Sequence, residues 1–215
     1  MNALLTVKNV QSTGMPNAIS FELQATQQVV LFGESGTGKS VLFKALADLI
    51  NHQGYVALKG RSQSDYCPEK WRQQVMFFSA ETAWWKETPE AHFDQLPTQA
   101  QLEAIGLNLA QLKQPISGLS SGEKQRFALL RGLSYQPTVL LLDEITANLD
   151  KLSTLNVERV VQDYCQTQQA AMIWISHDEA QQARLTDPDN QWDIQALYLK
   201  NNPGSLQWIW LRSRI

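Results

Sequence analysis

Short apolar runs recur along the chain and alternate with longer segments whose apolar residues lie three or four positions apart. The short runs predict β-strands, and the longer spacing predicts amphipathic helices. The runs at 139–142 and 171–175 are almost continuously apolar, which is typical of strands buried on both faces of a parallel sheet. Alternating strands and helices predict an α/β fold with a mainly parallel sheet. Predicted strands cover residues 4–10, 19–23, 29–32, 54–58, 75–78, 139–142, 171–175, 197–199 and 208–211, the last two as a terminal hairpin; predicted helices cover 41–50, 101–112, 124–133 and 152–167.

Between residues 79 and 118 the pattern changes, because three prolines interrupt it and no strand pattern appears. Residues 101–112 carry Leu102, Ile105 and Leu109 on one helical face. The serine and glutamate at 120 and 123 form a capping-box pattern at the start of the next predicted helix. We therefore expect one domain over residues 1–215, with a small helical subdomain at about 82–133 inserted in its core.

Composition excludes several classes of protein. The chain has 215 residues, 43% of them hydrophobic, and a net charge of −3. It has no long basic run, so we expect no nucleic-acid partner. The two cysteines, Cys67 and Cys165, match no metal-binding spacing, which favours a reducing compartment. No basic-then-apolar signal segment opens the sequence, and no apolar run approaches the roughly 20 residues that span a bilayer. We expect a soluble chain that meets a membrane only through a partner.

A glycine-rich loop follows the predicted strand at 29–32 and precedes the predicted helix at 41–50. Its pattern, G-x-x-x-x-G-K-S, is that of a phosphate-binding loop. A helix N-terminus offers free N–H groups and a positive dipole end to an anion, and glycines let the backbone approach it closely. In this pattern the lysine reaches the β- and γ-phosphates and the serine binds Mg²⁺. The alternative is an ordinary glycine-rich turn, which the strand–loop–helix context disfavours. The loop comprises Gly33, Glu34, Ser35, Gly36, Thr37, Gly38, Lys39 and Ser40.

Acidic and histidine side chains follow two other predicted strands. Asp143 and Glu144 end the run at 139–142, and His177 follows the run at 171–175. Ligands of parallel α/β sheets bind beyond the carboxyl ends of the strands. Asp143 is therefore a candidate Mg²⁺ ligand, and Glu144 is a candidate base for the attacking water. A plain acidic loop and a turn histidine are the alternatives.

Together these segments resemble an ATP-binding cassette (ABC) ATPase. The loop at 33–40 resembles Walker A, and residues 140–144 resemble Walker B. Residues 119–123, L-S-S-G-E, are similar to the family signature L-S-G-G-Q, and residues 147–150 to the D-loop with Asp150. His177 resembles the switch histidine. The run L-L-L-D-E-I-T-A-N-L-D and the segment at 71–75 look most like bacterial iron-efflux-type ATPase subunits.

The resemblance implies a P-loop cassette with an antiparallel β edge subdomain and a short helical subdomain. It also implies ATP and Mg²⁺ as ligands, and ATP hydrolysis with catalytic roles for Lys39, Glu144 and His177. Two cassettes, expected to be a homodimer, pack head to tail so that each signature caps the partner's ATP. A separate membrane permease places the pair on the cytoplasmic face of the inner membrane. The signature residues acting in trans are Ser120, Ser121, Gly122 and Glu123; a capped helix and a helix-start aspartate are the plain alternatives for the signature and for Asp150.

Two other functions stay open at this point. One is a soluble ABC ATPase that acts on ribosomes or DNA, although such proteins typically have two cassettes in one chain, or a coiled-coil or zinc insert. The other is a nucleotide-binding regulatory module with weak hydrolysis. The single cassette pattern and the intact candidate catalytic residues favour a transporter ATPase.

Three features depart from the family or stand out within it. No aromatic residue occurs among residues 1–20 to stack on adenine, and Met15 is only a weak substitute. The expected Q-loop glutamine is replaced by Ala80-Glu81, so we expect Glu81 to lie near Mg²⁺, the alternative being a solvated loop residue. Trp84 and Trp85 follow, either as an exposed docking surface for the permease or as the core of the helical subdomain.

Overall fold

The main sheet of the computed structural model is mixed but mainly parallel. The structure describes residues 3–34, 36–186, 194–199 and 208–211. Within this part of the chain, one sheet has the strand order β10-β9-β3-β8-β7-β6. All its neighbouring pairs are parallel except β10 with β9, which form the antiparallel terminal hairpin that the sequence predicts. The strands are β3 (Gln28–Gly33), β6 (Val75–Ser79), β7 (Val139–Asp143), β8 (Ala171–Ile175), β9 (Ile194–Leu199) and β10 (Trp208–Leu211).

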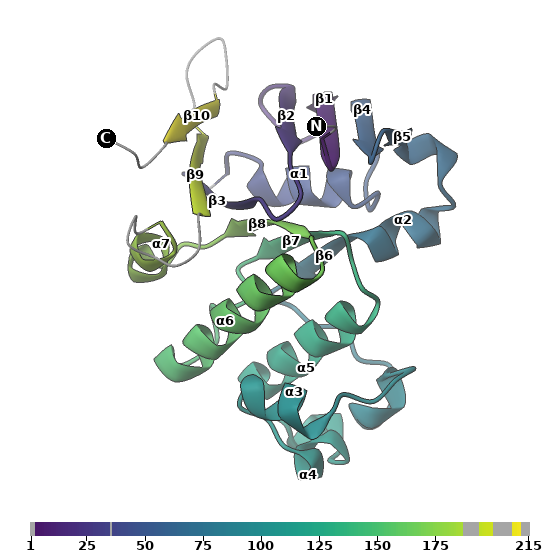
Figure 1. Ribbon diagram of the computed structural model, residues 1–215, viewed down its shortest axis with the longest axis vertical. Helices are drawn as coiled ribbons and strands as arrows, with labels where there is room; N and C mark the ends of the chain where they lie inside the picture. The colour runs from purple at the N-terminus through teal and green to yellow at the C-terminus, as the bar shows by residue number, and fades with distance from the viewer. Residues whose placement is uncertain (1–2, 35, 187–193, 200–207, 212–215) are drawn as a thin grey trace.

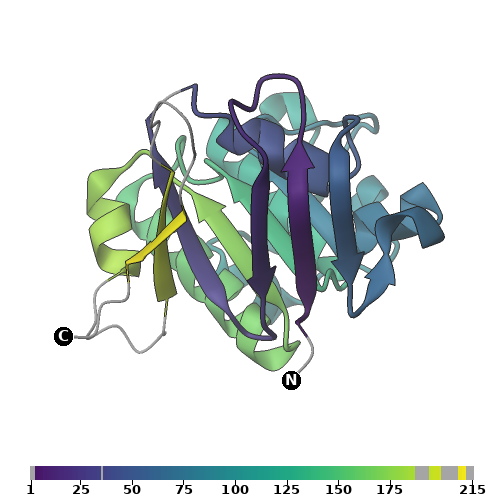
Figure 2. The same ribbon diagram turned by 90° about the horizontal axis from the view of Figure 1, so that it is seen from above.

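A second, antiparallel sheet has the order β2-β1-β4-β5. Figure 1 shows helix α1 (Lys39–Leu46) between this sheet and the main one, and Figure 2 shows the antiparallel strands lying across α1. This sheet is the antiparallel β edge subdomain that the family resemblance implies. Its strands are β1 (Leu5–Gln11), β2 (Ile19–Leu23), β4 (Gln53–Leu58) and β5 (Arg61–Ser62).

The main sheet is buried on both faces, as its continuous apolar strands predict. Along β7, Leu141 points into the core shared with α1 and the antiparallel sheet, whereas Leu140 and Leu142 point to the opposite core. Helices α5 (Ser121–Ser134) and α6 (Lys151–Thr167) contribute to that second core. Two covered faces leave the strand ends as the accessible part of the sheet, and the candidate site residues lie there.

Further helices that contribute residues to the second core come from the middle of the chain. Helices α3 (Gln99–Ala104), α4 (Leu109–Leu112) and α5 extend away from the main sheet in Figure 1. They fall in the segment for which the sequence predicts a helical subdomain, and the boundary at 82–133 stays a prediction. None of the described helices is long and apolar enough to cross a membrane.

The prediction of one helix over residues 101–112 is wrong. The chain breaks into α3 and α4 at Gly106, whose φ of 71° lies in the left-handed region that favours glycine. Capping boxes at Thr98 and Asn108 start the two short helices. Leu109, which we placed on the buried face, is consequently exposed, and Leu107 and Leu112 are buried instead.

The predicted helix at 41–50 begins earlier and ends earlier, as α1. Asp48 adopts a φ of 57° just beyond its end, and this terminates the helical path. Leu49 is therefore exposed rather than on the core face. Among the described helices, the hydrophobic pattern did not predict α2 (Pro68–Gln74) or α7 (Glu179–Leu185). Each has only seven residues and buries few side chains.

Candidate functional site

The phosphate-binding loop joins β3 to the N-terminus of α1, as predicted. Gly36 and Gly38 have φ values of 80° and 86°, which glycine adopts without strain. A Cβ at Gly38 would also lie 3.0 Å from the Gly14 carbonyl oxygen, which is a tighter contact than Cβ atoms usually make. Ser35 of the predicted loop lies outside the described residues. The loop therefore leaves the first turn of α1 facing the edge of the sheet.

Lys39 is folded into this loop and is nearly buried. Its Nζ donates hydrogen bonds to the carbonyl oxygens of Gly33, at 2.7 Å, and Glu34, at 2.9 Å. Burial lowers the pKa of Lys39, and the nearby carboxylates of Asp143 and Glu144 act against that shift. The ammonium group thus occupies the inside of the loop, where it is held by backbone oxygens that an anionic phosphate can replace.

Ser40 and Asp143 meet at the edge of the sheet. The Ser40 hydroxyl donates a hydrogen bond to the Asp143 carboxylate, and burial raises the pKa of Asp143. Asp143 Oδ1 is buried without a hydrogen-bond partner among the described residues. A hydroxyl and a carboxylate oxygen are ligands that suit Mg²⁺, and an unpartnered buried oxygen is stabilised by a cation. The residues therefore fit a magnesium ion.

Glu144 and His177 lie side by side at the same edge. His177 Nε2 is 3.1 Å from Glu144 Oε1, and both side chains are partly exposed. Strands β7 and β8 pair in parallel with Asp143 opposite Ile175, so their following loops start level with each other. The Glu144 N–H also donates to the Ile175 carbonyl, at 3.0 Å. Glu144 has a φ of 53°, which is strained for a glutamate. This backbone conformation ends the extended path of β7 directly after Asp143.

Glu81 follows β6, the other neighbour of β7. Its side chain is exposed, and its backbone carbonyl accepts a hydrogen bond from Ser79 Oγ at 2.6 Å. Glu81 also lines a cavity of about 330 Å³ together with Arg131 and Gln125. The proximity of Glu81 to Mg²⁺ stays a prediction.

The signature segment starts α5 with the predicted capping box. Ser120 Oγ accepts from the Glu123 N–H, and the Ser120 N–H donates to Glu123 Oε2 at 2.7 Å. The Ser120 N–H and the Ser120 hydroxyl both donate to the Glu123 carboxylate and thereby lower the pKa of Glu123. Gln111 of α4 also donates to the Glu123 carboxylate. The glutamate in place of the family's glutamine therefore caps its own helix, and Ser121 and Gly122 belong to that first turn.

Asp150 caps α6 in the same way. Its carboxylate accepts from the Ser153 N–H at 3.0 Å and from Ser153 Oγ at 2.7 Å. These bonds lower the pKa of the exposed Asp150 carboxylate. A helix cap is thus what the described structure gives to Asp150, and its role across a dimer stays a prediction.

Trp84 and Trp85 occupy different environments. Trp85 is 67% exposed, whereas Trp84 packs against the second core. The Arg131 guanidinium lies 4.7 Å from the Trp84 ring and 4.9 Å from the Trp85 ring. His92, which sequence reasoning missed, is buried and contacts both rings edge-on. Met15, the weak candidate for adenine stacking, lies beside Gly38 and is only 6% exposed.

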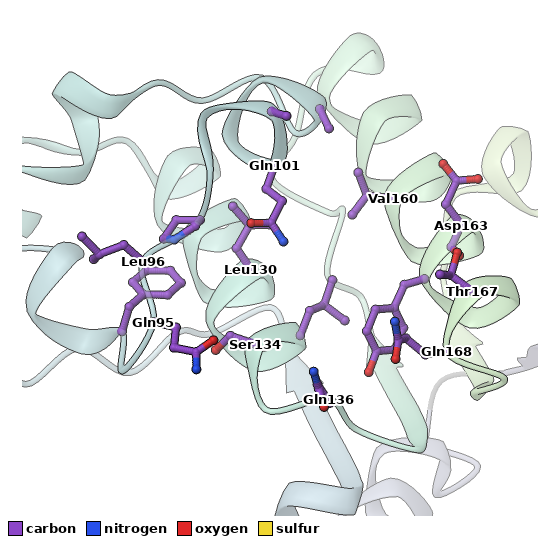
Figure 3. A pocket seen from close by; sticks show the side chains of 16 residues that line it. Gln95, Leu96, Gln101, Leu130, Ser134, Gln136, Val160, Asp163, Thr167 and Gln168 are labelled. Carbon is purple, nitrogen blue, oxygen red and sulfur yellow. The ribbon is translucent and has the colours of Figure 1, made fainter.

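Another cavity, of about 560 Å³, lies between the helical segment and α6 (Figure 3). Gln101 lies on its α3 side, and Val160 and Asp163 lie on its α6 side. None of the predicted site residues that the structure describes lines this cavity, and no sequence motif pointed to it. We therefore place the candidate site at the carboxyl edge of the main sheet.

Comparisons with known proteins agree with this geometry. The family model described as "ABC transporter" matches residues 16–147. The probable iron export ATP-binding protein FetA of Escherichia coli K12 is 36% identical over 178 residues, covering 76% of this chain and 78% of that protein. The aliphatic sulfonates import ATP-binding protein SsuB 2 of Mesorhizobium japonicum is 35% identical over 179 residues, covering 80% of this chain and 68% of that protein.

The fold also matches a solved structure. A bacterial Atm1-family ABC exporter with ATP bound superimposes with a TM-score of 0.72 and 21% identity, over 91% of this chain. The match spans 37% of that longer chain, and at this identity it concerns the fold alone. The family model and the two sequence relatives confirm the resemblance inferred from the motifs: the chain belongs to the family of ATP-binding proteins of ABC transporters.

Proposed function

We propose that this protein binds and hydrolyses ATP and thereby energises a separate membrane permease. The observation that carries the proposal is the convergence of Lys39, Ser40, Asp143, Glu144 and His177 on one sheet edge. Asp143 Oδ1, which is buried and has no hydrogen-bond partner in the described part of the chain, supports a cation in the same place. Together these groups supply the cationic, metal-binding and basic functions that phosphoryl transfer to water requires.

ATP binding relies on the loop between β3 and α1. The N–H groups of the first turn of α1 face the phosphates, and Lys39 exchanges its two backbone carbonyl partners for phosphate oxygens. Ser40 and Asp143 hold Mg²⁺, which neutralises charge on the phosphates when it is bound. Burial raises the Asp143 pKa, and a bound cation reverses this penalty because it stabilises the ionised carboxylate.

Hydrolysis relies on Glu144 and His177. Glu144 accepts a proton from the attacking water or orients it, and its carboxylate is partly exposed and so reachable by water. His177, whose Nε2 lies 3.1 Å from Glu144 Oε1, donates a hydrogen bond that orients the carboxylate. The family resemblance further implies that His177 contacts the γ-phosphate of bound ATP. The base and the orienting group thus lie in the loops after two adjacent strands, β7 and β8.

The complete site requires a second cassette, expected to be a second copy of this chain. The signature Ser120, Ser121 and Gly122 form a helix N-terminus, which suits a phosphate of ATP bound to the partner. Asp150 lies close in sequence to the Walker B end and contacts the partner across the dimer. One chain alone thus holds half of each of two ATP sites.

The permease docks on the Trp85 surface, consisting of Trp85 and Arg131. An exposed tryptophan beside a guanidinium is a typical interface anchor. The relatives are named export and import ATP-binding proteins, which supports a membrane partner and a place on the cytoplasmic face of the membrane.

Size-exclusion chromatography of the Glu144→Gln variant tests the proposal, alongside ATPase assays of the wild type. Removal of the base lets ATP bind without being consumed, so the variant forms a dimer with ATP and Mg²⁺ but not with ADP. Glu69→Gln, an exposed change on α2, is the matched control and behaves as wild type. Absence of both wild-type hydrolysis and an ATP-dependent dimer would refute the proposal.

A further inference from the structure

A buried chain of hydrogen bonds lies behind the Glu144–His177 pair. Thr146 Oγ1 donates to Gln181 Oε1 at 2.9 Å, and Gln181 Nε2 donates to Glu158 Oε1 at 2.9 Å. Arg184 donates to the same Glu158 oxygen at 2.8 Å. Gln181 is fully buried, and Thr146 and Glu158 are nearly so. The chain crosses from the loop after β7 to α7 and on to α6.

The chemistry of these groups fixes which atom donates and which accepts in each of these hydrogen bonds. The Glu158 carboxylate, paired with Arg184, only accepts hydrogen bonds, so the Gln181 amide nitrogen must face it. The Gln181 amide oxygen is thereby left for the Thr146 hydroxyl. A side chain that both donates and accepts is needed at Gln181, and neither leucine nor glutamate meets both demands.

Two members of these linked hydrogen bonds lie close in sequence to the proposed catalytic groups. Thr146 comes two residues after Glu144, and Gln181 comes four residues after His177. The Asp178 carboxylate caps α7 by accepting from the N–H groups of Ala180 and Gln181, which fixes the helix relative to His177. The contact between Glu144 and His177 is itself partly exposed and consists of one hydrogen bond, so it sets their separation only weakly.

We propose that Gln181 is a positioning residue that holds the loop of Glu144 in register with the loop of His177. This inference rests on the proposed function for its catalytic consequence. The backbone bond from Glu144 to Ile175 joins the two loops at their start, and the Thr146–Gln181 bond joins them farther on. These two hydrogen bonds lie on either side of the partly exposed Glu144–His177 contact. Together they hold the Glu144 and His177 side chains in one relative position.

Thr146→Val and Gln181→Leu test the link, because both keep the size of the side chain and remove the hydrogen bond. We expect kcat for MgATP to fall about 10-fold, with KM changed less than about twofold, since misplaced catalytic groups lower turnover more than binding. Thr138→Val is the matched control. It removes a hydrogen bond from Thr138 to Gln74 at the opposite end of β7 and should leave kcat unchanged.

A rescue experiment separates positioning from simple packing. Gln181→Glu sets a second carboxylate against Glu158, so kcat should fall further than in Gln181→Leu. Adding Glu158→Gln restores one donor facing one acceptor, and kcat should return to within about threefold of the wild type. A double variant no more active than Gln181→Glu alone would overturn the inference.

A readout without nucleotide makes the test independent of hydrolysis. The chain has three histidines, His52, His92 and His177, so ring ¹⁵N signals from labelled histidine are few and assignable. Thr146→Val and Gln181→Leu should move or broaden the His177 signals and leave those of His52 and His92 in place. His177 signals that do not move in these variants would overturn the inference. A wild-type protein without ATPase activity would refute the proposed function, and the NMR measurement alone would then decide whether Gln181 positions the two loops.

Discussion

His177 Nε2 lies 3.1 Å from Glu144 Oε1, although the two residues come from loops after different strands. The contact arises because β7 and β8 are adjacent and parallel, with Asp143 opposite Ile175. A strained φ of 53° at Glu144 then directs the chain away from the strand. The pair therefore depends on strand order, which tertiary structure sets.

Removal of the imidazole tests this pair directly. We expect His177→Ala to lower kcat by about 10²–10⁴-fold, the range for loss of a positioned acid–base or orienting group. Binding of a fluorescent ATP analogue should persist, because Lys39 and the phosphate-binding loop are intact. His52→Ala, on the antiparallel sheet side, is the control, and equal activity losses in the two variants would contradict the assignment.

Asp143→Asn should stabilise the protein without nucleotide and abolish Mg²⁺-dependent hydrolysis. Burial raises the folded-state pKa of Asp143 above its ordinary value of 3.8. A raised carboxyl pKa means that the folded state binds the proton more tightly, so its ionisation destabilises the fold as pH rises from about 3.8 through the raised value. At neutral pH the amide avoids this cost.

Thermal melts with and without Mg²⁺–ATP measure the effect. We expect the melting temperature of nucleotide-free Asp143→Asn to lie a few degrees, roughly 2–4 °C, above that of the wild type. Mg²⁺–ATP should raise the wild-type melting temperature more than that of the variant, because binding to the folded state stabilises it. A variant that melts lower than wild type at pH 7 would contradict the prediction.

Glu81 tests the altered Q-loop. If its carboxylate contributes to the metal site, Glu81→Ala lowers ATPase activity or raises the Mg²⁺ concentration needed for half-maximal rate. Glu81→Gln restores the residue usual in the family and should support hydrolysis at least as well as the wild type. An unchanged Mg²⁺ titration in Glu81→Ala would show that this exposed side chain does not contribute to the metal site. Its place would then be in the lining of the cavity that Arg131 also lines.

Replacing Trp84 or Trp85 by alanine should have different effects on the free energy of unfolding, because only Trp84 packs against a core. Trp84 packs against the second core, so Trp84→Ala should lower the free energy of unfolding by roughly 2 kcal/mol, part of the cost for a fully buried ring. Trp85, which is 67% exposed, should change it by less than about 0.5 kcal/mol when replaced by alanine. Urea denaturation of both variants measures the difference, and a large loss in Trp85→Ala would count against a docking surface.

His92 holds the backbone beneath that surface. Its Nε2 accepts hydrogen bonds from the Trp85 and Lys86 N–H groups, at 3.1 and 3.0 Å, and its Nδ1 donates to the Thr88 carbonyl. His92→Leu leaves these groups unpaired, so we expect about 1–3 kcal/mol less stability and faster tryptic cleavage after Lys86. His52→Leu serves as the comparison; equal cleavage rates would show that the loop is held by other contacts.

Sequence patterns predicted most of the main sheet, because β-strands that are buried on both faces have continuous apolar sequences. They also placed the phosphate-binding loop, since its glycines and its strand–loop–helix context are local features. Helix breaks were predicted poorly. Gly106 ends α3 through a left-handed φ, and two capping boxes restart the chain, yet the spacing of Leu102, Ile105 and Leu109 suggested a single helix.

The sequence by itself determined the identity of the chemistry: a lysine and a serine on a glycine loop, acidic residues after one strand and a histidine after another. Only the tertiary structure decided which of these groups meet, because contacts between loops depend on strand order and register. It alone brought Gln181 to Thr146 and Glu158, and separated Trp84 from Trp85 by burial. Such contacts join residues distant in the chain, and no local periodicity encodes them.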